Sequence, residues 1–502
     1  MPRPLLVLVV LLLPLATSAQ SVSSIGEPIR PDRAPLASAP EVPAVLLLGL
    51  SGPTAALVNP ARSARARDRF VYGTLHRGGA PLTFVGIFGT RDRRWLLTAD
   101  NHIAVREDSE TRTQSQSSDF PAGGSSSSSS ERIYENESVT TVTRARLLHV
   151  GRTDFGGYAF GLFGGYRSLR FEADRTTAST STRDFPELPS TETRRQTGEQ
   201  LQLEDNDDFA VGVEAAFAGR TWDLAASVSY QHRSAEAALE RSDALDFMSD
   251  DPIRSLTEER LEAFAHTVEA TPRAVDFEVI GTLRAGRDRD DYLYGAVSGT
   301  VGSGTADYAS STANRLFLIR EIGGEVVQEE SSDSEFTDDG SVDLDTRATQ
   351  ASLGYVYARR ARRMLILAAI NPTAAFERVE SVSTLASFGV PGSKRVSDRT
   401  ALALNLPLYV RFDVTKGLEA FGGGVYTYSY DRTEYTDRPL STPSGAMIQT
   451  TEFSRTTDFV ASRGRLFAGA LFTFRSGLVA QASFHGDLAA LSGWTASLGY
   501  RF

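Results

Sequence analysis

The residues that could carry out hydrolytic chemistry are scattered along this sequence. Its histidines fall in separate segments, among them His102, His149, His232, His266 and His485. A hydrolytic site needs a nucleophile, a base and an orienting group within hydrogen-bond reach of one another. The sequence contains no Gly-x-Ser-x-Gly elbow, no His-Glu-x-x-His pair and no P-loop. We therefore expect no enzymatic activity, since an enzyme would need a Ser/His/Asp cluster that only the fold brings together.

The segment from Ser234 to Thr271 contains a candidate binding element. Ser255 with Glu258 forms a capping-box pattern, which predicts the start of a helix. Four apolar residues that follow lie near one helical face: Leu256, Leu261, Phe264 and Val268. We predict an amphipathic helix at the mouth of the protein. This helix either binds a hydrophobic small molecule, or it packs on the rim so that its own apolar face is buried.

Two further segments are polar enough to be solvated. Glu329 to Asp345 is acidic, but its carboxylates do not have the spacing of an EF-hand ligand set. Gly123 to Ser130 is a Gly-Gly pair followed by a serine run, which predicts a flexible loop tip. We expect neither a metal site nor a cofactor. The net charge of −11 also argues against nucleic acid as a partner.

A repeated strand pattern from Arg69 to Phe502 must position these segments. In Ala401 to Asp413, every second residue is apolar: Leu402, Leu404, Leu406, Leu408, Val410 and Phe412. In Asp208 to Ala218, Phe209, Val211, Val213, Ala215 and Phe217 share one face, opposite Gly212 and Glu214. This alternation is typical of a wall between lipid and a wet interior, and also of a soluble sheet with one buried face. Its repetition without a second, helical layer favours the barrel.

Connections of two lengths alternate along the chain. Tight turns are predicted near 91–94, 152–157, 218–222, 286–290, 359–363, 415–417 and 475–477, and long polar loops near 107–131, 176–196, 234–271, 309–343, 381–396 and 433–456. Short turns on one side and long loops on the other are the organisation of outer-membrane barrels. We predict an all-β, transmembrane, antiparallel up-and-down β-barrel of about sixteen strands, with fourteen to eighteen as the range.

The N-terminal end of the chain predicts export. Met1 to Ala19 has a basic residue, a short apolar run and a small-residue cleavage site, which predicts a secretory signal peptide. No later stretch is apolar enough for a spanning helix, so an exported chain that spans a membrane would be a closed barrel. The predicted divisions are 1–19 as signal peptide, 20–68 as linker and lumen plug, and 69–502 as barrel. The chain has no cysteine, so no disulfide framework is expected.

Two segments resemble known families. Trp494, Ala496, Leu498, Tyr500 and Phe502 share one face of a strand. This resembles the terminal strand of bacterial outer-membrane β-barrels, which implies that Tyr500 and Phe502 serve as a signal to the barrel-assembly machinery. Asn59, Pro60 and Ala61 end a small-residue segment that resembles the N-terminal region of the long-chain fatty-acid transporter (FadL-like) family. In that family the segment plugs the lumen. A plain turn before the first strand is the alternative.

These patterns lead to one functional hypothesis with an alternative. We expect an integral outer-membrane barrel, surrounded by lipid and lipopolysaccharide, that acts as a passive uptake channel for small, hydrophobic molecules. The alternative is a non-transport barrel that acts as a surface scaffold, adhesin or assembly partner.

Overall fold

Strands make up nearly all of the chain that the structure describes. The computed structural model describes residues 59, 61, 70–76, 82–89, 94–119, 125–185, 190–250, 254–285, 291–322, 325–385, 393–439, 453–487 and 490–501. Its strands are β1 (Phe70–His76), β2 (Leu82–Gly89), β3 (Arg94–Asp119), β4 (Ser125–Arg152), β5 (Gly157–Phe185), β6 (Ser190–Ala218), β7 (Trp222–Asp250), β8 (Arg254–Ala270), β9 (Arg273–Arg284), β10 (Tyr292–Ile322), β11 (Glu325–Ala361), β12 (Met364–Leu385), β13 (Ser393–Thr415), β14 (Leu418–Pro439), β15 (Phe453–Thr473), β16 (Leu478–Asp487) and β17 (Ala490–Arg501).

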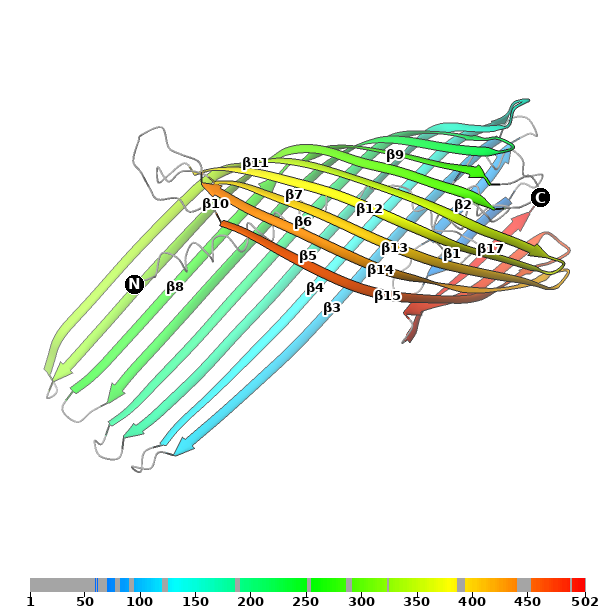
Figure 1. Cartoon of the computed structure of the whole chain (residues 1–502). Coiled ribbons are helices and arrows are strands. Elements are labelled where there is room, and N and C mark those ends of the chain that lie inside the picture. Colours follow the sequence, from blue (N-terminus) through cyan, green and yellow to red (C-terminus); the bar gives the residue numbers. More distant parts are fainter. Residues whose placement is uncertain are drawn as a thin grey trace.

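The sheet closes on itself, as predicted for a barrel. Neighbouring strands pair antiparallel around the wall (Figure 1). The last strand, β17, pairs antiparallel with the first, from Phe70 opposite Arg501 to His76 opposite Thr495. Closure satisfies the backbone groups that an open sheet would leave unpaired. The architecture is therefore an antiparallel up-and-down barrel.

Segments β8 and β9 share one position in the wall. Both pair with β7 on one side and with β10 on the other. They are separated only by Thr271 and Pro272, and proline cannot donate to a ladder. The seventeen described segments thus occupy sixteen positions around the barrel.

Alternate residues face opposite sides of the wall, with the parity that the sequence predicts. On β13, Leu402, Leu404, Leu406 and Leu408 are between 38% and 47% exposed, whereas Tyr409, the residue after Leu408, is 3% exposed. On β6, Phe209, Val211 and Val213 are exposed and Glu214 is buried. Exposed large apolar residues in one band on strand after strand form a surface suited to hydrocarbon. The opposite face of the wall lines the interior.

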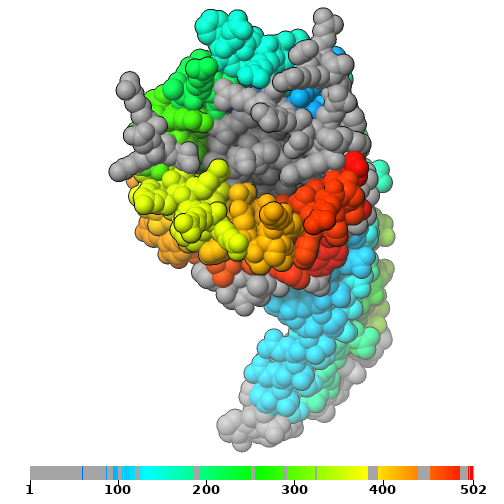
Figure 2. Space-filling view, turned by 90° about the vertical axis from the view of Figure 1, so that its right-hand side faces the viewer, coloured from blue at the N-terminus to red at the C-terminus, as the bar shows by residue number. Residues whose placement is uncertain are grey.

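The tight turns predicted at 152–157, 218–222, 359–363, 415–417 and 475–477 separate consecutive strands. Residues 91–93, 286–290, 386–392 and 440–452, which belong to the other two predicted turns and to the loops predicted at 381–396 and 433–456, lie outside the described residues. The other four predicted long loops are wrong. Most of residues 107–131, 176–196, 234–271 and 309–343 continue the strands, and Ser125–Ser130 of the expected flexible tip belongs to β4. Their outer ends form an open sheet that we call the blade: residues 106–119, 125–138, 171–185, 190–204, 237–250, 254–268, 308–322 and 325–340. It runs past the ends of β12–β15 (Figure 1). Figure 2 looks onto the end of the barrel that carries the short turns. The blade extends below and behind the ring of the wall in this view.

The helix predicted from Ser255 to Val268 is also wrong, because this segment is strand β8. Its residues pair with β7 and β10 on both sides, from Ser255 opposite Asp250 and Glu321 onward. These two ladders satisfy its backbone, whereas a short isolated helix is only marginally stable in water. Strand geometry then separates the four apolar residues: Leu256, Phe264 and Val268 share one face of the strand, and Leu261 lies on the other.

Candidate functional site

The inner wall carries three layers of side chains along its axis. The layer nearest the short turns is mainly apolar on both halves of the barrel, although it also holds the buried polar residues Arg94, Asp223 and Gln481. One half contributes a buried cluster with Tyr409, Phe421 and Phe467, and the other contributes a cluster with Leu148 and Val150. These residues lie at the ends of strands that meet the short turns. The lumen therefore has a mainly apolar lining at this end.

A piece of the N-terminal segment lies inside this first layer. Asn59 is 2% exposed and its Nδ2 donates to the carbonyl oxygen of Phe217 at 3.1 Å. Its Oδ1 accepts from the backbone N–H of Ala61 at 3.1 Å, and Ala61 is fully buried in the cluster that contains Leu148. The asparagine thus fastens the chain to the end of β6. Pro60, the remaining residue of the three predicted to form the plug, lies outside the described residues.

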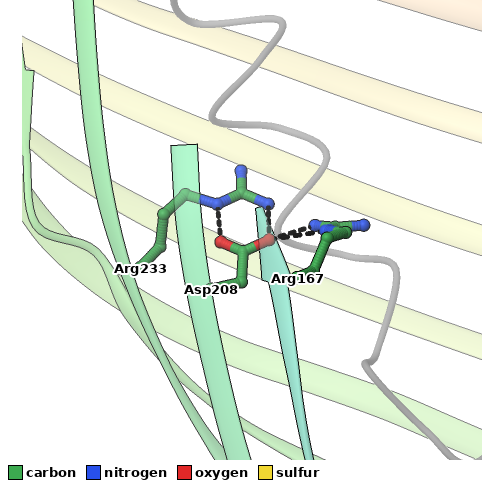
Figure 3. Close-up of polar contacts among 3 residues, drawn as sticks. All are labelled: Arg167, Asp208 and Arg233. Atoms are coloured by element: carbon green, nitrogen blue, oxygen red, sulfur yellow. Dashed lines mark hydrogen bonds and ion pairs between the residues drawn. The ribbon is translucent and has the colours of Figure 1, made fainter. Parts of the chain in front are cut away.

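The middle layer is charged, and three of its residues stand directly opposite one another on β5, β6 and β7. Asp208 lies between Arg167 and Arg233 (Figure 3). Arg167 Nε donates to Asp208 Oδ2 at 2.7 Å, and Arg233 Nη2 donates to the same oxygen at 2.9 Å while its Nε contacts Oδ1. Asp208 and Arg233 are at most 5% exposed. Charges this deeply buried are tolerated when they are paired and hydrogen-bonded.

Two more buried polar pairs belong to the middle layer. Arg146 of β4 reaches across β5 to pair with Glu214 of β6. Thr300 of β10 donates to Asp276 of β9 at 2.5 Å, and Asp276 is fully buried. A solute that traverses the lumen would meet fixed charges and hydroxyls between two mainly apolar zones.

The third layer is an apolar patch on the inner face where the barrel continues into the blade. It includes Ala235, Val268, Tyr308, Val342 and Leu344, all buried. It begins directly beyond Arg233, because Ala235 is the next residue on that face of β7. A hydrophobic surface therefore lies immediately above the charged layer. We call it the rim patch.

His266 is the one titratable ring that joins the rim patch from β8. It is 3% exposed, and neither ring nitrogen has a hydrogen-bond partner. The rings of Phe264 and Tyr308 lie 6.2 Å and 6.1 Å from it, centroid to centroid. His266 lies beyond the band of exposed apolar residues, in a part of β8 where the outer face carries the exposed polar residues Thr267 and Glu269. Burial lowers the pKa of His266, so its imidazole is neutral at pH 7.

The structure brings together some of the residues that the sequence nominated for ligand binding. Phe264 and Val268 lie beside His266 on the inner face. Leu256 shares their face farther along β8, whereas Leu261 is 42% exposed on the other face. Sequence reasoning missed His266, because nothing in its own segment shows that β7 and β10 bury it.

Other candidate residues lie elsewhere. Tyr500 is exposed on the outer face of β17, and Phe502 lies outside the described residues. His149 packs with Trp95 and Phe160 in an aromatic group on the outer face, so its side chain does not line the lumen. In the part of the chain that the structure describes, no three His, Cys, Asp or Glu side chains are grouped to hold a metal ion. No helix among the described residues is long and apolar enough to cross a membrane.

Comparisons with known proteins found structural likeness only. No protein-family model matches the sequence, and no curated protein does. The structure is similar to a TodX monoaromatic hydrocarbon channel mutant at 11% identity, over 90% of this chain and 93% of that one, with a TM-score of 0.31. It is also similar to the translocator domain of the autotransporter NalP from Neisseria meningitidis at 11% identity, over 62% and 87%, with a TM-score of 0.26. The copper transporter OprC matches at 8% identity, over 87% and 80%, with a TM-score of 0.26. Since these TM-scores are below 0.5, the barrel assignment depends on this chain's own strand pairing.

Proposed function

We propose that the protein is an outer-membrane channel for the passive uptake of small molecules that combine an apolar body with a polar group. The observation that supports this is the layered inner wall, which is mainly apolar at both ends and has a layer of buried ion pairs between them. A solute of this kind gains apolar contact at the rim patch and at the layer near the short turns, and hydrogen bonds at the middle layer.

The proposed location follows from the outer face of the wall. Its exposed apolar band suits a bilayer, and the predicted signal peptide suits export. We place the short turns in the periplasm and the blade outside the cell. Lipid, lipopolysaccharide and the barrel-assembly machinery are the partners that this placement implies, with Tyr500 in the strand that the machinery would read. The absence of a recognised catalytic motif leads us to propose no enzymatic role.

The N-terminal segment is the proposed gate. Asn59 and Ala61 lie in the inner layer near the short turns, where a solute would leave the lumen. Displacing them would require breaking the hydrogen bond to Phe217 and exposing Ala61. We propose that residues 20–68 plug the lumen and move aside during uptake.

Solute entry into liposomes tests the channel. Mature protein is reconstituted, and uptake of phenylalanine, which has an aromatic body and charged groups, is compared with that of a sugar of similar mass. We expect faster uptake of phenylalanine, and faster uptake of both after removal of residues 20–68. If no solute enters even after this deletion, the channel proposal is wrong and a non-transport barrel remains.

A further inference from the structure

The blade has two edges that no strand pairs within the described part of the chain. β3 pairs with β2 only as far as Asn101, and beyond it β3 bonds to β4 alone. On the opposite side, β11 pairs with β12 only from Gly340 onward, so Glu325–Asp339 bonds to β10 alone. A free edge presents N–H and C=O groups that serve as a template for another strand.

The two edges differ in how they are protected. The edge Glu325–Asp339 has no basic residue and carries seven carboxylates: Glu325, Glu329, Glu330, Asp333, Glu335, Asp338 and Asp339. The outer part of the β3 edge, Thr113–Ser118, reads Thr-Gln-Ser-Gln-Ser-Ser and has no charge. All of its side chains are exposed. Because charged residues are what proteins use to block edge pairing, the β11 edge is blocked and the outer β3 edge is open.

Charge also selects the partner strand. If two copies met through their β11 edges, carboxylates would face carboxylates, which is unfavourable. If two β3 edges met antiparallel, with the two-fold axis between Ser115 and Gln116, Thr113 would face Ser118 and Gln114 would face Ser117. Every facing pair in this stretch is then neutral and able to form hydrogen bonds. The β3 edge is therefore complementary to itself.

Strand direction selects the geometry of the two copies. β3 runs from the short turn at Arg94 to the tip of the blade at Asp119. Copies in one membrane all point their β3 strands outward, so these strands cannot lie antiparallel. Copies in two facing membranes point toward each other, and their β3 edges meet antiparallel.

We propose that the β3 edge at Thr113–Ser118 binds the same edge of a second copy in a facing membrane, and so joins two blades into one sheet. This homotypic adhesion is separate from the proposed channel and does not need it. The interface is isologous, because each copy supplies the same residues.

Vesicle clustering tests the proposal. Full-length mature protein is placed in two liposome populations that carry donor and acceptor dyes. We expect clustering well above that of protein-free liposomes, and at least a tenfold loss when both populations carry Ser115→Lys or both carry Gln116→Glu, because a charge on this edge blocks pairing. Mixing Ser115→Lys liposomes with Gln116→Glu liposomes should restore clustering, because these two positions face each other across the axis and then carry opposite charges. The matched control is Ser332→Lys on the β11 edge, which should cluster like the wild type.

Disulfide formation provides a second readout. The chain has no cysteine, so a mixture of the Ser115→Cys and Gln116→Cys variants places one thiol of each copy at positions that face each other. Oxidation should link copies across the axis, where Cα atoms of facing strands lie about 5 Å apart, within disulfide range. Ser332→Cys should stay monomeric. The proposal is overturned if wild-type liposomes do not cluster, or if Ser332→Cys links as readily as the β3 variants. Solute uptake by the same liposomes reports on the channel independently.

Discussion

Pro272, in the break between β8 and β9, lies against Gly304 of β10, just below the blade. A Cβ atom placed on Gly304 would lie 2.4 Å from Cα of Pro272. The Pro272 carbonyl accepts from Arg233 N–H at 3.0 Å, and Thr271 N–H donates to Thr305 at 3.0 Å. The glycine lets β10 approach the proline closely, so that β8 and β9 continue as one position in the wall.

Gly304→Val should therefore destabilise the barrel. The added atoms meet backbone and ring atoms that cannot move aside, and overpacking of this kind costs about 1–3 kcal/mol. The measurement is the temperature at which the folded band disappears on a semi-native gel. Gly295→Ala on the same strand is the control, since nothing lies within 4 Å of a Cβ there. Equal effects of the two variants would contradict the role given to Gly304.

Asp208→Asn should destabilise the protein strongly. It leaves Arg167 and Arg233 buried beside a neutral amide, and breaking a buried charge pair costs about 3–5 kcal/mol. Urea unfolding in detergent measures the loss. The control is Asp205→Asn, whose partner Arg170 lies 3.6 Å away and is 74% exposed, and it should cost about 1 kcal/mol or less. A small effect at Asp208 would show that its arginines do not depend on it.

Asn59→Ala should increase ion conductance. The change removes the bond to Phe217 and the one to Ala61, each worth about 0.5–1.5 kcal/mol net. A looser N-terminal segment should open the lumen more often in planar bilayers. Asn405→Ala is the control, because Asn405 bonds to Asn371 and Thr427 on another part of the inner wall. Unchanged conductance in Asn59→Ala would argue against a gating role.

His266→Phe should remove part of the acid sensitivity of the fold. Leu239 of β7 and Ser310 of β10 lie directly opposite His266, and Tyr308 of β10 is the titratable group whose ring lies beside it; Arg241 of β7 is one pair farther along, opposite Phe264. Because its pKa is lowered in the folded state, the unfolded chain takes up a proton first as the pH falls below about 6.5. The free energy of unfolding then falls until the pH passes the folded pKa.

The comparison of wild type with His266→Phe isolates this contribution from the carboxylates. Urea midpoints should decline less steeply with acid in the variant. Tyr308→Phe keeps the imidazole and the adjacent ring, so it should decline like the wild type. Parallel curves for wild type and His266→Phe would contradict the assignment.

The membrane-facing wall could be predicted from the sequence because its two faces have different solvents. Leu402 and Tyr409 end on opposite faces, as their spacing requires, and the five predicted tight turns that fall on described residues separate the strands as predicted. The blade could not be predicted, because water bathes both of its faces and its strands need no alternation. Ser125–Ser130 is a strand only because β3 and β5 pair with it.

The candidate site was less predictable, because it depends on register between distant strands. Arg167, Asp208 and Arg233 meet only when β5, β6 and β7 are aligned. The apolar spacing of Leu256, Leu261, Phe264 and Val268 fits a helix as a local pattern. Two neighbouring ladders determine the outcome instead, and they bury His266, which the local pattern does not single out.

The seam between Phe70–His76 and the final strand has a consequence for biogenesis. β1 needs β17 as its partner, the described strand that lies farthest from it in the sequence, so a chain in which synthesis stops before β17 cannot close its wall. Both edges of such a sheet stay unpaired, and loss of residues 490–501 should therefore expose the product to proteases.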